Sequence, residues 1–126
     1  MTRILVVDDS PTMRLIAGAM LRKLGFEVTE AGDGEQALRA CMIEMPAGIL
    51  LDWNMPVMDG LSLLKALRRH EQGGRPKVIF CTTESHFSLI SQAISHGADE
   101  FIMKPYDIEI LRSKMVYTGL LLDDAA

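Results

Sequence analysis

Short runs of apolar residues alternate along the chain with longer segments in which apolar residues recur every three or four positions. The short runs have the length of buried strands, and the longer segments have the period of amphipathic helices. The pattern predicts five strands at residues 4–7, 26–31, 48–51, 78–81 and 101–103. It predicts a helix after each strand, over residues 11–24, 36–42, 61–68, 86–96 and 108–115.

Local signals support several of these boundaries. Ser10 followed by Pro11 is typical of a helix start, and Asp107 is a second candidate cap. Gly25 and Pro46 are expected to end the first two helices. Apolar residues of the first helix are expected to form one buried stripe, namely Met13, Ile16, Ala17, Met20, Leu21 and Leu24.

Strict alternation of strand and helix predicts an α/β fold, a doubly wound parallel sheet with helices on both faces. The strands read as continuous apolar runs, which fits strands that are buried on both sides. The 126 residues suit one domain, so residues 1–126 are expected to form a single domain without an output domain.

Composition narrows the function classes. Hydrophobic residues make up 48% and charged residues 24% of the chain, a globular balance, and the net charge of −4 disfavours a direct nucleic-acid partner. The start of the chain resembles neither a signal peptide nor a membrane span, so a cytoplasmic protein is expected. Cys41 and Cys81 lie in apolar surroundings and are expected to be buried thiols.

Polar residues stand where the predicted strands end. Asp8 and Asp9 follow the first strand, Asp52 the third, Thr82 the fourth and Lys104 the fifth. Ligands of open α/β sheets bind outside the carboxyl ends of the strands. If the first, third, fourth and fifth strands lie side by side, these residues converge on one pocket.

Three carboxylates in one pocket repel one another unless a cation lies among them, and oxygen ligands in small number favour Mg²⁺. Lys104 then suits an anion that arrives with the metal, for which a phosphoryl group is the natural candidate, and Thr82 could donate its hydroxyl to it. Asp52 could act as a carboxylate nucleophile toward a phosphoryl donor. Each residue taken singly also has a simpler interpretation. Asp8 and Asp9 could merely cap the first helix, Asp52 could be a turn residue, and Lys104 could be a solvated lysine.

Other residues are given structural interpretations. His70, His86 and His96 are expected at the surface or at helix ends, and Arg68 and Arg69 on a solvated helix face. Trp53 is expected to report on metal or phosphate beside Asp52. Among the methionines, Met13, Met20 and Met115 are expected in the core. Met55 and Met58 are expected to be exposed in the loop after Asp52.

The chain resembles the bacterial response-regulator receiver family, most closely its stand-alone chemotaxis (CheY-like) type. The resemblance lies in residues 6–10 and 52–60, in Thr82, and in Lys104 with Pro105. It implies the five-stranded flavodoxin-like (βα)5 fold with strand order 2-1-3-4-5. It also implies a two-component protein that is phosphorylated by a sensor histidine kinase or a histidine phosphotransfer protein.

The resemblance implies a role for each site residue. Asp52 would be the phosphoacceptor, and Mg²⁺ would be held by Asp9, by Asp52, by the backbone carbonyl of Asn54 and, through a water, by Asp8. Lys104 would bind the phosphoryl oxygens. Thr82 and Phe101 would move together as the switch, and residues flanking the site, Asn54 and Glu84, would tune the lifetime of the phosphate.

The resemblance also implies an output. The face formed by the fourth helix, fifth strand and fifth helix would change its affinity for a downstream protein, with the chemotaxis type suggested by the Asp52 loop. A monomer is expected, with a phosphorylation-dependent dimer as an option. Thr83 departs from the small residue that usually follows the switch threonine, and Tyr106 from the commoner phenylalanine. Thr83 leaves two hydroxyls as candidates, of which the spacing to Lys104 favours Thr82.

Two alternatives stay open at this point. The protein could be a phosphate sink or shuttle in a phosphorelay, or a small phosphotransferase enzyme with an aspartyl-phosphate intermediate. Asn54, two residues after Asp52, disfavours the enzyme, because a general acid is wanted there. The expected protein is therefore no enzyme toward outside substrates and catalyses only its own phosphorylation and dephosphorylation.

Overall fold

The computed structural model describes residues 1–70, 72–83 and 88–122, which form a five-stranded parallel sheet in the order β2-β1-β3-β4-β5. The strands are β1 (Arg3–Val7), β2 (Glu27–Ala31), β3 (Gly48–Asp52), β4 (Lys77–Thr82) and β5 (Glu100–Met103). The helices are α1 (Pro11–Lys23), α2 (Gly34–Ile43), α3 (Gly60–Arg69), α4 (Ile90–Ser95) and α5 (Ile108–Tyr117). The predicted fold class and strand order are confirmed.

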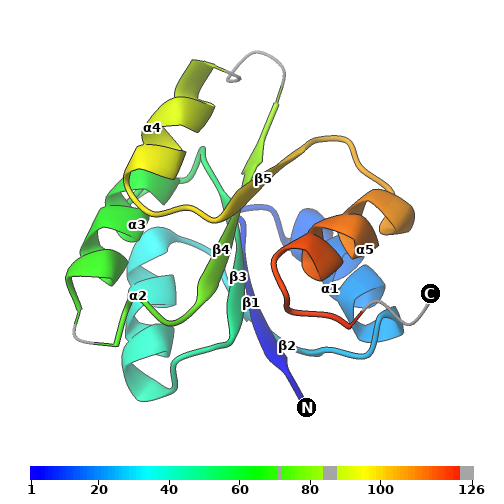
Figure 1. Cartoon of the computed structure of the whole chain (residues 1–126). Helices are drawn as coiled ribbons and strands as arrows, with labels where there is room; N and C mark the ends of the chain where they lie inside the picture. The colour runs from blue at the N-terminus through cyan, green and yellow to red at the C-terminus, as the bar shows by residue number, and fades with distance from the viewer. Residues whose placement is uncertain (71, 84–87, 123–126) are drawn as a thin grey trace.

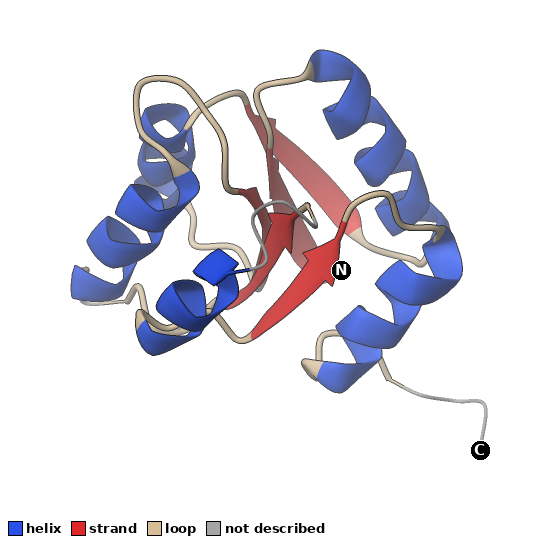
Figure 2. Cartoon of the chain, turned by 90° about the horizontal axis from the view of Figure 1, so that it is seen from above, coloured by secondary structure: helices blue, strands red, loops and turns tan. Residues whose placement is uncertain are grey.

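Helices cover both faces of the sheet, α1 and α5 on one side and α2, α3 and α4 on the other (Figures 1 and 2). The alternation of side chains along each strand divides the core accordingly. In β1, Leu5 and Val7 belong to the cluster under α2 and α3, while Ile4 and Val6 belong to the cluster under α1 and α5. None of the helices in the described part of the chain has the length and hydropathy needed to cross a membrane.

Side-chain caps begin four helices close to the ends of the strands. Ser10 Oγ accepts the Met13 N–H at 3.2 Å in α1, and Asp107 accepts the Ile110 N–H at 2.9 Å in α5, as their positions predicted. Asp33 and Asp59 do the same for α2 and α3. Each cap contributes about 1 kcal/mol to helix stability, and together they fix where the strand-to-helix loops end.

Three local predictions are wrong. The predicted helix over residues 86–96 is shorter: within the described residues the α-helix begins at Ile90, and His86 lies outside them. Ile16 is 44% exposed, so the apolar stripe of α1 is narrower than its spacing suggests. Met55 is buried in the core and Met58 packs against it, because the loop after β3 folds back over α2 and α3.

Arg68 is half-buried in a network of polar contacts and does not lie on a solvated helix face, contrary to the prediction. Its guanidinium donates to the carbonyl oxygens of Gly73, Pro76 and Gly97 at 2.6–3.1 Å. The guanidinium also pairs with Asp99 at 3.1 Å. The Asp99 carboxylate in turn accepts the backbone N–H of Val78 in β4. Arg68 therefore connects α3 to the loops that precede β4 and β5.

Candidate functional site

The predicted side chains converge at the carboxyl edge of the sheet. Asp8 follows β1, Asp52 ends β3, Thr82 ends β4 and Lys104 follows β5. Because these strands are parallel neighbours in register, their ends open on one cleft of about 300 Å³. The described lining residues are Asp8, Asp9, Ser10, Met13, Asp52, Trp53, Asn54, Cys81, Thr82, Thr83 and Lys104.

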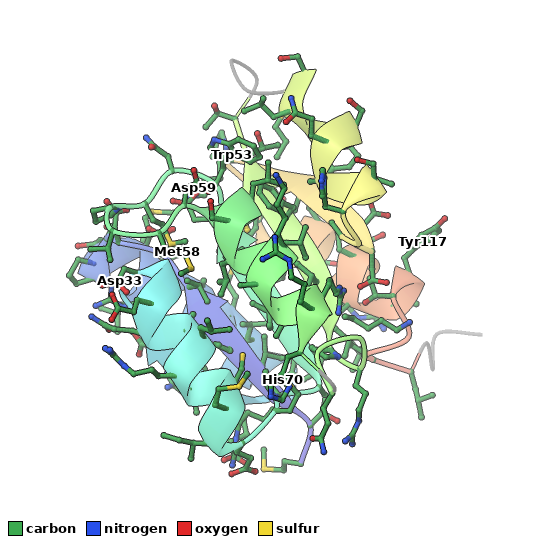
Figure 3. All side chains as sticks on the ribbon, turned by 90° about the vertical axis from the view of Figure 1, so that its left-hand side faces the viewer. Asp33, Trp53, Met58, Asp59, His70 and Tyr117 are labelled. Atoms are coloured by element: carbon green, nitrogen blue, oxygen red, sulfur yellow. The ribbon has the colours of Figure 1, made fainter. Side chains whose placement is uncertain are left out.

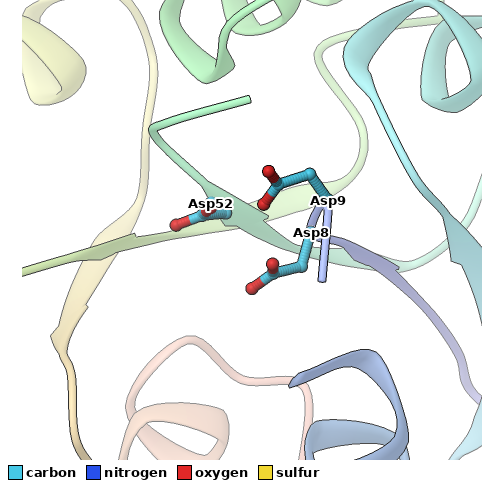
Figure 4. A group of neighbouring side chains, drawn as sticks. All are labelled: Asp8, Asp9 and Asp52. Carbon is cyan, nitrogen blue, oxygen red and sulfur yellow. The ribbon is translucent and has the colours of Figure 1, made fainter. Parts of the chain in front are cut away.

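The three aspartates point into the same space (Figure 4). Each offers a carboxylate oxygen within 4.8 Å of those of the other two. Asp8 is only 7% exposed, and its Oδ1 accepts the Ser10 N–H at 3.0 Å. Asp9 is exposed at the mouth of the cleft. Carboxylate oxygens in this arrangement form a donor set for a hard divalent cation.

Lys104 lies opposite the aspartates and contacts two of them. Its Nζ donates to Asp52 Oδ1 at 2.9 Å and to Asp8 Oδ2 at 3.1 Å. Its backbone N–H donates to the Thr82 carbonyl at 2.7 Å, which holds the residue against the end of β4. The described lining residues therefore include three aspartates and one lysine, so ionisation of all four leaves two negative charges unbalanced.

Burial raises the pKa of Asp52, and the hydrogen bond and charge of Lys104 only partly offset it. Burial by itself lowers the pKa of the Lys104 amine. The hydrogen bond with Asp52 and the charges of Asp52 and Asp8 outweigh this effect, so the pKa of the amine is raised. A carboxyl whose pKa is raised by folding stabilises the fold at low pH and loses that contribution as the pH rises through the folded-state pKa. Ionised Asp52 therefore costs stability at neutral pH, and a bound cation would offset this cost.

The loop after Asp52 is packed closely against the strand end. The Gly60 N–H donates to the Trp53 carbonyl at 3.0 Å, and a Cβ at Gly60 would collide with the Asp52 carbonyl oxygen. Val57 has a φ of 68°, in the left-handed region that β-branched residues avoid. The loop thus carries backbone strain and tight packing immediately beside Asp52, features that gather at functional sites.

Trp53 lies at the cleft, whereas His70 and His96 lie at helix ends away from it. Trp53 lines the cleft and packs edge-on against Phe80, with ring centroids 5.2 Å apart. Trp53 and Asp59 lie at the end of the molecule that carries the cleft, whereas His70 lies at the far end of α3 (Figure 3). His70 and His96 are exposed at helix ends, as predicted.

The switch candidates lie on β4 and β5. Thr82 is buried, and its hydroxyl donates to the Thr83 carbonyl at 3.3 Å. Both threonines line the cleft. Phe101 is half-buried, and Lys114 Nζ lies 4.6 Å from its ring centroid while pairing with Glu100 at 3.3 Å. Asn54 is exposed at the cleft, and Glu84 lies outside the described residues.

Several residues of the site were not assigned to it from the sequence, among them Met13, which was expected in the core and is half-buried at the cleft. Ser10 and Met13 line the cleft from the start of α1, and Arg14 contacts the Asp8 backbone. The helix-start signal and the motif over residues 6–10 both include Ser10, but no sequence signal indicated Met13 or Arg14 for the site. Cys81 also lines the cleft, but burial raises the pKa of its thiol, and Cys41 is likewise buried with a pKa of about 11. Both thiols stay protonated at neutral pH, as expected of buried cysteines.

Comparison with known proteins identifies the family. The family model for the response regulator receiver domain matches residues 4–116 of the sequence. The chain belongs to this family. A relative of this receiver domain, the probable chemotaxis protein CheY of Rhizobium etli, is 36% identical over 113 residues, which cover 88% of this chain and 87% of the relative.

Solved structures agree with this assignment. The receiver domain superposes on chemotaxis protein CheY4 of Vibrio cholerae with a TM-score of 0.88 and 31% identity, covering 94% of this chain and 98% of that one. It also resembles the receiver domain of the sensor histidine kinase PA1611 from Pseudomonas aeruginosa, with a TM-score of 0.83, 32% identity and coverage of 94% and 98%. That structure has a magnesium ion coordinated in its active-site cleft.

Proposed function

We propose that this receiver domain is a stand-alone response regulator that accepts a phosphoryl group on Asp52 in the presence of Mg²⁺. One observation carries the proposal: a lysine amine bridges Asp52 and Asp8 at 2.9 and 3.1 Å, within a cleft that also contains Asp9. The relatives support a stand-alone protein, since the chain covers 87% of the Rhizobium etli relative and 98% of the Vibrio cholerae structure.

The proposed reaction is a phosphoryl transfer from a phosphohistidine to a carboxylate. An Asp52 oxygen attacks phosphorus and forms the P–O bond of an acyl phosphate, while the P–N bond breaks and the released imidazole takes a proton from solvent. The Lys104 amine would exchange its carboxylate partners for the oxygens of the arriving phosphoryl group and neutralise part of their charge. Thr82 supplies a hydroxyl at the same edge of the cleft.

The aspartates fit a divalent cation. Their oxygens lie within 4.8 Å of one another, and their charge exceeds that of Lys104. Asp9 and Asp52 would hold Mg²⁺ directly together with the Asn54 carbonyl, and Asp8 would act through a water. When bound, Mg²⁺ neutralises charge on the phosphoryl oxygens and on the carboxylates.

The proposed output is a change of affinity on the face formed by α4, β5 and α5, for a downstream protein in a chemotaxis pathway. Phe101 lies on β5 with the Lys114 amine over its ring, so a rotation of the ring would alter charge and shape together. The helices α4 and α5 also carry exposed apolar side chains, Ile94, Ile110 and Tyr117, that suit a protein partner. Asn54 and Glu84 are proposed to tune the phosphate lifetime.

The direct test is labelling with acetyl phosphate, followed by intact mass. We expect the protein to gain one phosphoryl group in millimolar Mg²⁺ and none in excess chelator, because only the metal-bound site tolerates another anion. Hydroxylamine should remove the group, as it cleaves acyl phosphates. Labelling that is equal with and without Mg²⁺ would contradict the proposal.

Turnover, back-transfer and binding assays separate the alternatives. A phosphotransferase enzyme would release inorganic phosphate from many equivalents of a phosphate monoester, whereas a response regulator would turn over only its own acyl phosphate. A sink or shuttle would pass its phosphoryl group back to a histidine phosphotransfer protein and would show no phosphorylation-dependent binding of another protein.

A further inference from the structure

Arg14 joins α1 to the backbone of the acidic turn after β1. Its Nη1 donates to the Asp8 carbonyl oxygen at 2.7 Å, and its Nε pairs with Glu30 of β2 at 3.1 Å. The side chain is 19% exposed, so most of it is packed into the protein. The Asp8 carbonyl belongs to the peptide group that links Asp8 to Asp9.

The Asp8 carbonyl needs this donor because the sheet stops beside it. The Asp8 N–H donates to the Ala31 carbonyl at 3.2 Å, continuing the β1–β2 ladder. In a parallel ladder the Asp8 carbonyl would then accept the N–H of residue 33. The chain has already turned away there: the Gly32 N–H donates to Gln36, and Asp33 caps α2. Arg14 takes the place of the missing ladder donor.

The surroundings of Arg14 suit an arginine specifically, and a lysine would not make the same contacts. The guanidinium lies against the turn after β2, where a Cβ at Gly32 would be at contact distance, 3.4 Å, from Arg14 Nη1. The planar fork reaches Glu30 through Nε and Asp8 through Nη1 at once. A lysine has a single amine and could not span both acceptors with the same geometry.

We propose that Arg14, oriented by Glu30, is a positioning residue of the divalent-cation site, an inference that rests on the proposed function. Holding the Asp8 carbonyl fixes the plane of the Asp8–Asp9 peptide group. The Ser10 N–H donates to the Asp8 carboxylate at 3.0 Å and holds the side chain. The exposed Asp9 carboxylate, which has no such bond among the described contacts, is thereby directed toward Asp52 by its backbone.

Charge and positioning make opposite predictions for this residue. Arg14 is a positive charge near a cation site, so charge alone would make its removal tighten Mg²⁺ binding. Positioning makes its removal weaken binding, because Asp9 must then be ordered when the cation arrives. The sign of the change therefore identifies the mechanism.

The experiment measures the Mg²⁺ dissociation constant by calorimetry, and by fluorescence of Trp53, the single tryptophan of the chain. We expect R14Q to weaken binding by about tenfold, the lower range for residues that orient metal ligands. R14K should weaken it several-fold although the charge is retained. R39Q is the matched control: Arg39 forms an exposed pair with Glu35 on α2, and its loss should leave the constant unchanged.

Affinity of R14Q equal to or tighter than that of the wild type would overturn the role of Arg14. If circular dichroism shows R14Q to be unfolded, R14K decides, and wild-type affinity in R14K overturns the role. Failure of the proposed function looks different, since the wild type itself would then bind no Mg²⁺ and take no phosphoryl group from acetyl phosphate. That result would remove both proposals.

Discussion

Asp52→Asn will leave the protein unable to take a phosphoryl group from acetyl phosphate, while the fold is kept. Asparagine has the shape of aspartate and can keep the place of Asp52 at the end of β3, but its amide oxygen is not a nucleophile of comparable strength. The change also removes one of the two carboxylates that Lys104 Nζ contacts, at 2.9 Å. We expect loss of all labelling above background in millimolar Mg²⁺, measured by intact mass.

The same chemical change at Asp59 is the control. Asp59 lies in the same loop and caps α3 by accepting the Ser62 N–H at 2.8 Å, a bond that asparagine can also accept. D59N should therefore be labelled like the wild type. Labelling of D52N at the wild-type level would place the acceptor elsewhere, and the peptide that carries the group would then identify it.

Arg68→Ala will destabilise the fold by about 3 kcal/mol, the size expected when a partly buried charged hydrogen-bonding group is removed. Alanine leaves the carbonyls of Gly73, Pro76 and Gly97 without their donor and leaves Asp99 without its 3.1 Å partner. The guanidinium is 17% exposed, so water can replace part of these contacts. The melting temperature should fall by roughly 10 °C.

Arg69→Ala provides the comparison, because Arg69 is the next residue of α3 and is exposed. Its replacement should change the free energy of unfolding by no more than about 0.5 kcal/mol. Equal melting temperatures for R68A and R69A would show that Arg68 is as dispensable as a solvated arginine, contrary to its contacts.

The parts of the fold that sequence predicts well depend on nearby residues. Ser10 and Asp107 cap helices as their positions indicate, since a cap contacts an N–H three residues away. The convergence of Asp8 with Lys104, 96 residues later, also followed from sequence. It needs parallel strands that end at one edge of the sheet. It also needs the first, third, fourth and fifth strands to lie side by side, an order that the family resemblance implied.

The parts that sequence missed depend on tertiary contacts. Besides the carboxylates of Asp99 and Glu30, Arg68 and Arg14 bind backbone carbonyl oxygens, and a carbonyl carries no sequence signal. Met55 is buried because its loop packs against the start of α2, where a Cβ on Gly34 would lie 2.6 Å from the carbonyl oxygen of Met58 in that loop. Composition of the loop alone suggested exposure.

A structure determined with Mg²⁺ and beryllofluoride, an analogue of the acyl phosphate, tests the central claim most directly. We predict beryllium bonded to an Asp52 oxygen, Mg²⁺ in contact with Asp9 and Asp52, and the Lys104 amine moved from its carboxylate partners to a fluorine. Beryllium on another side chain, or Mg²⁺ held without Asp9 and Asp52, would contradict it.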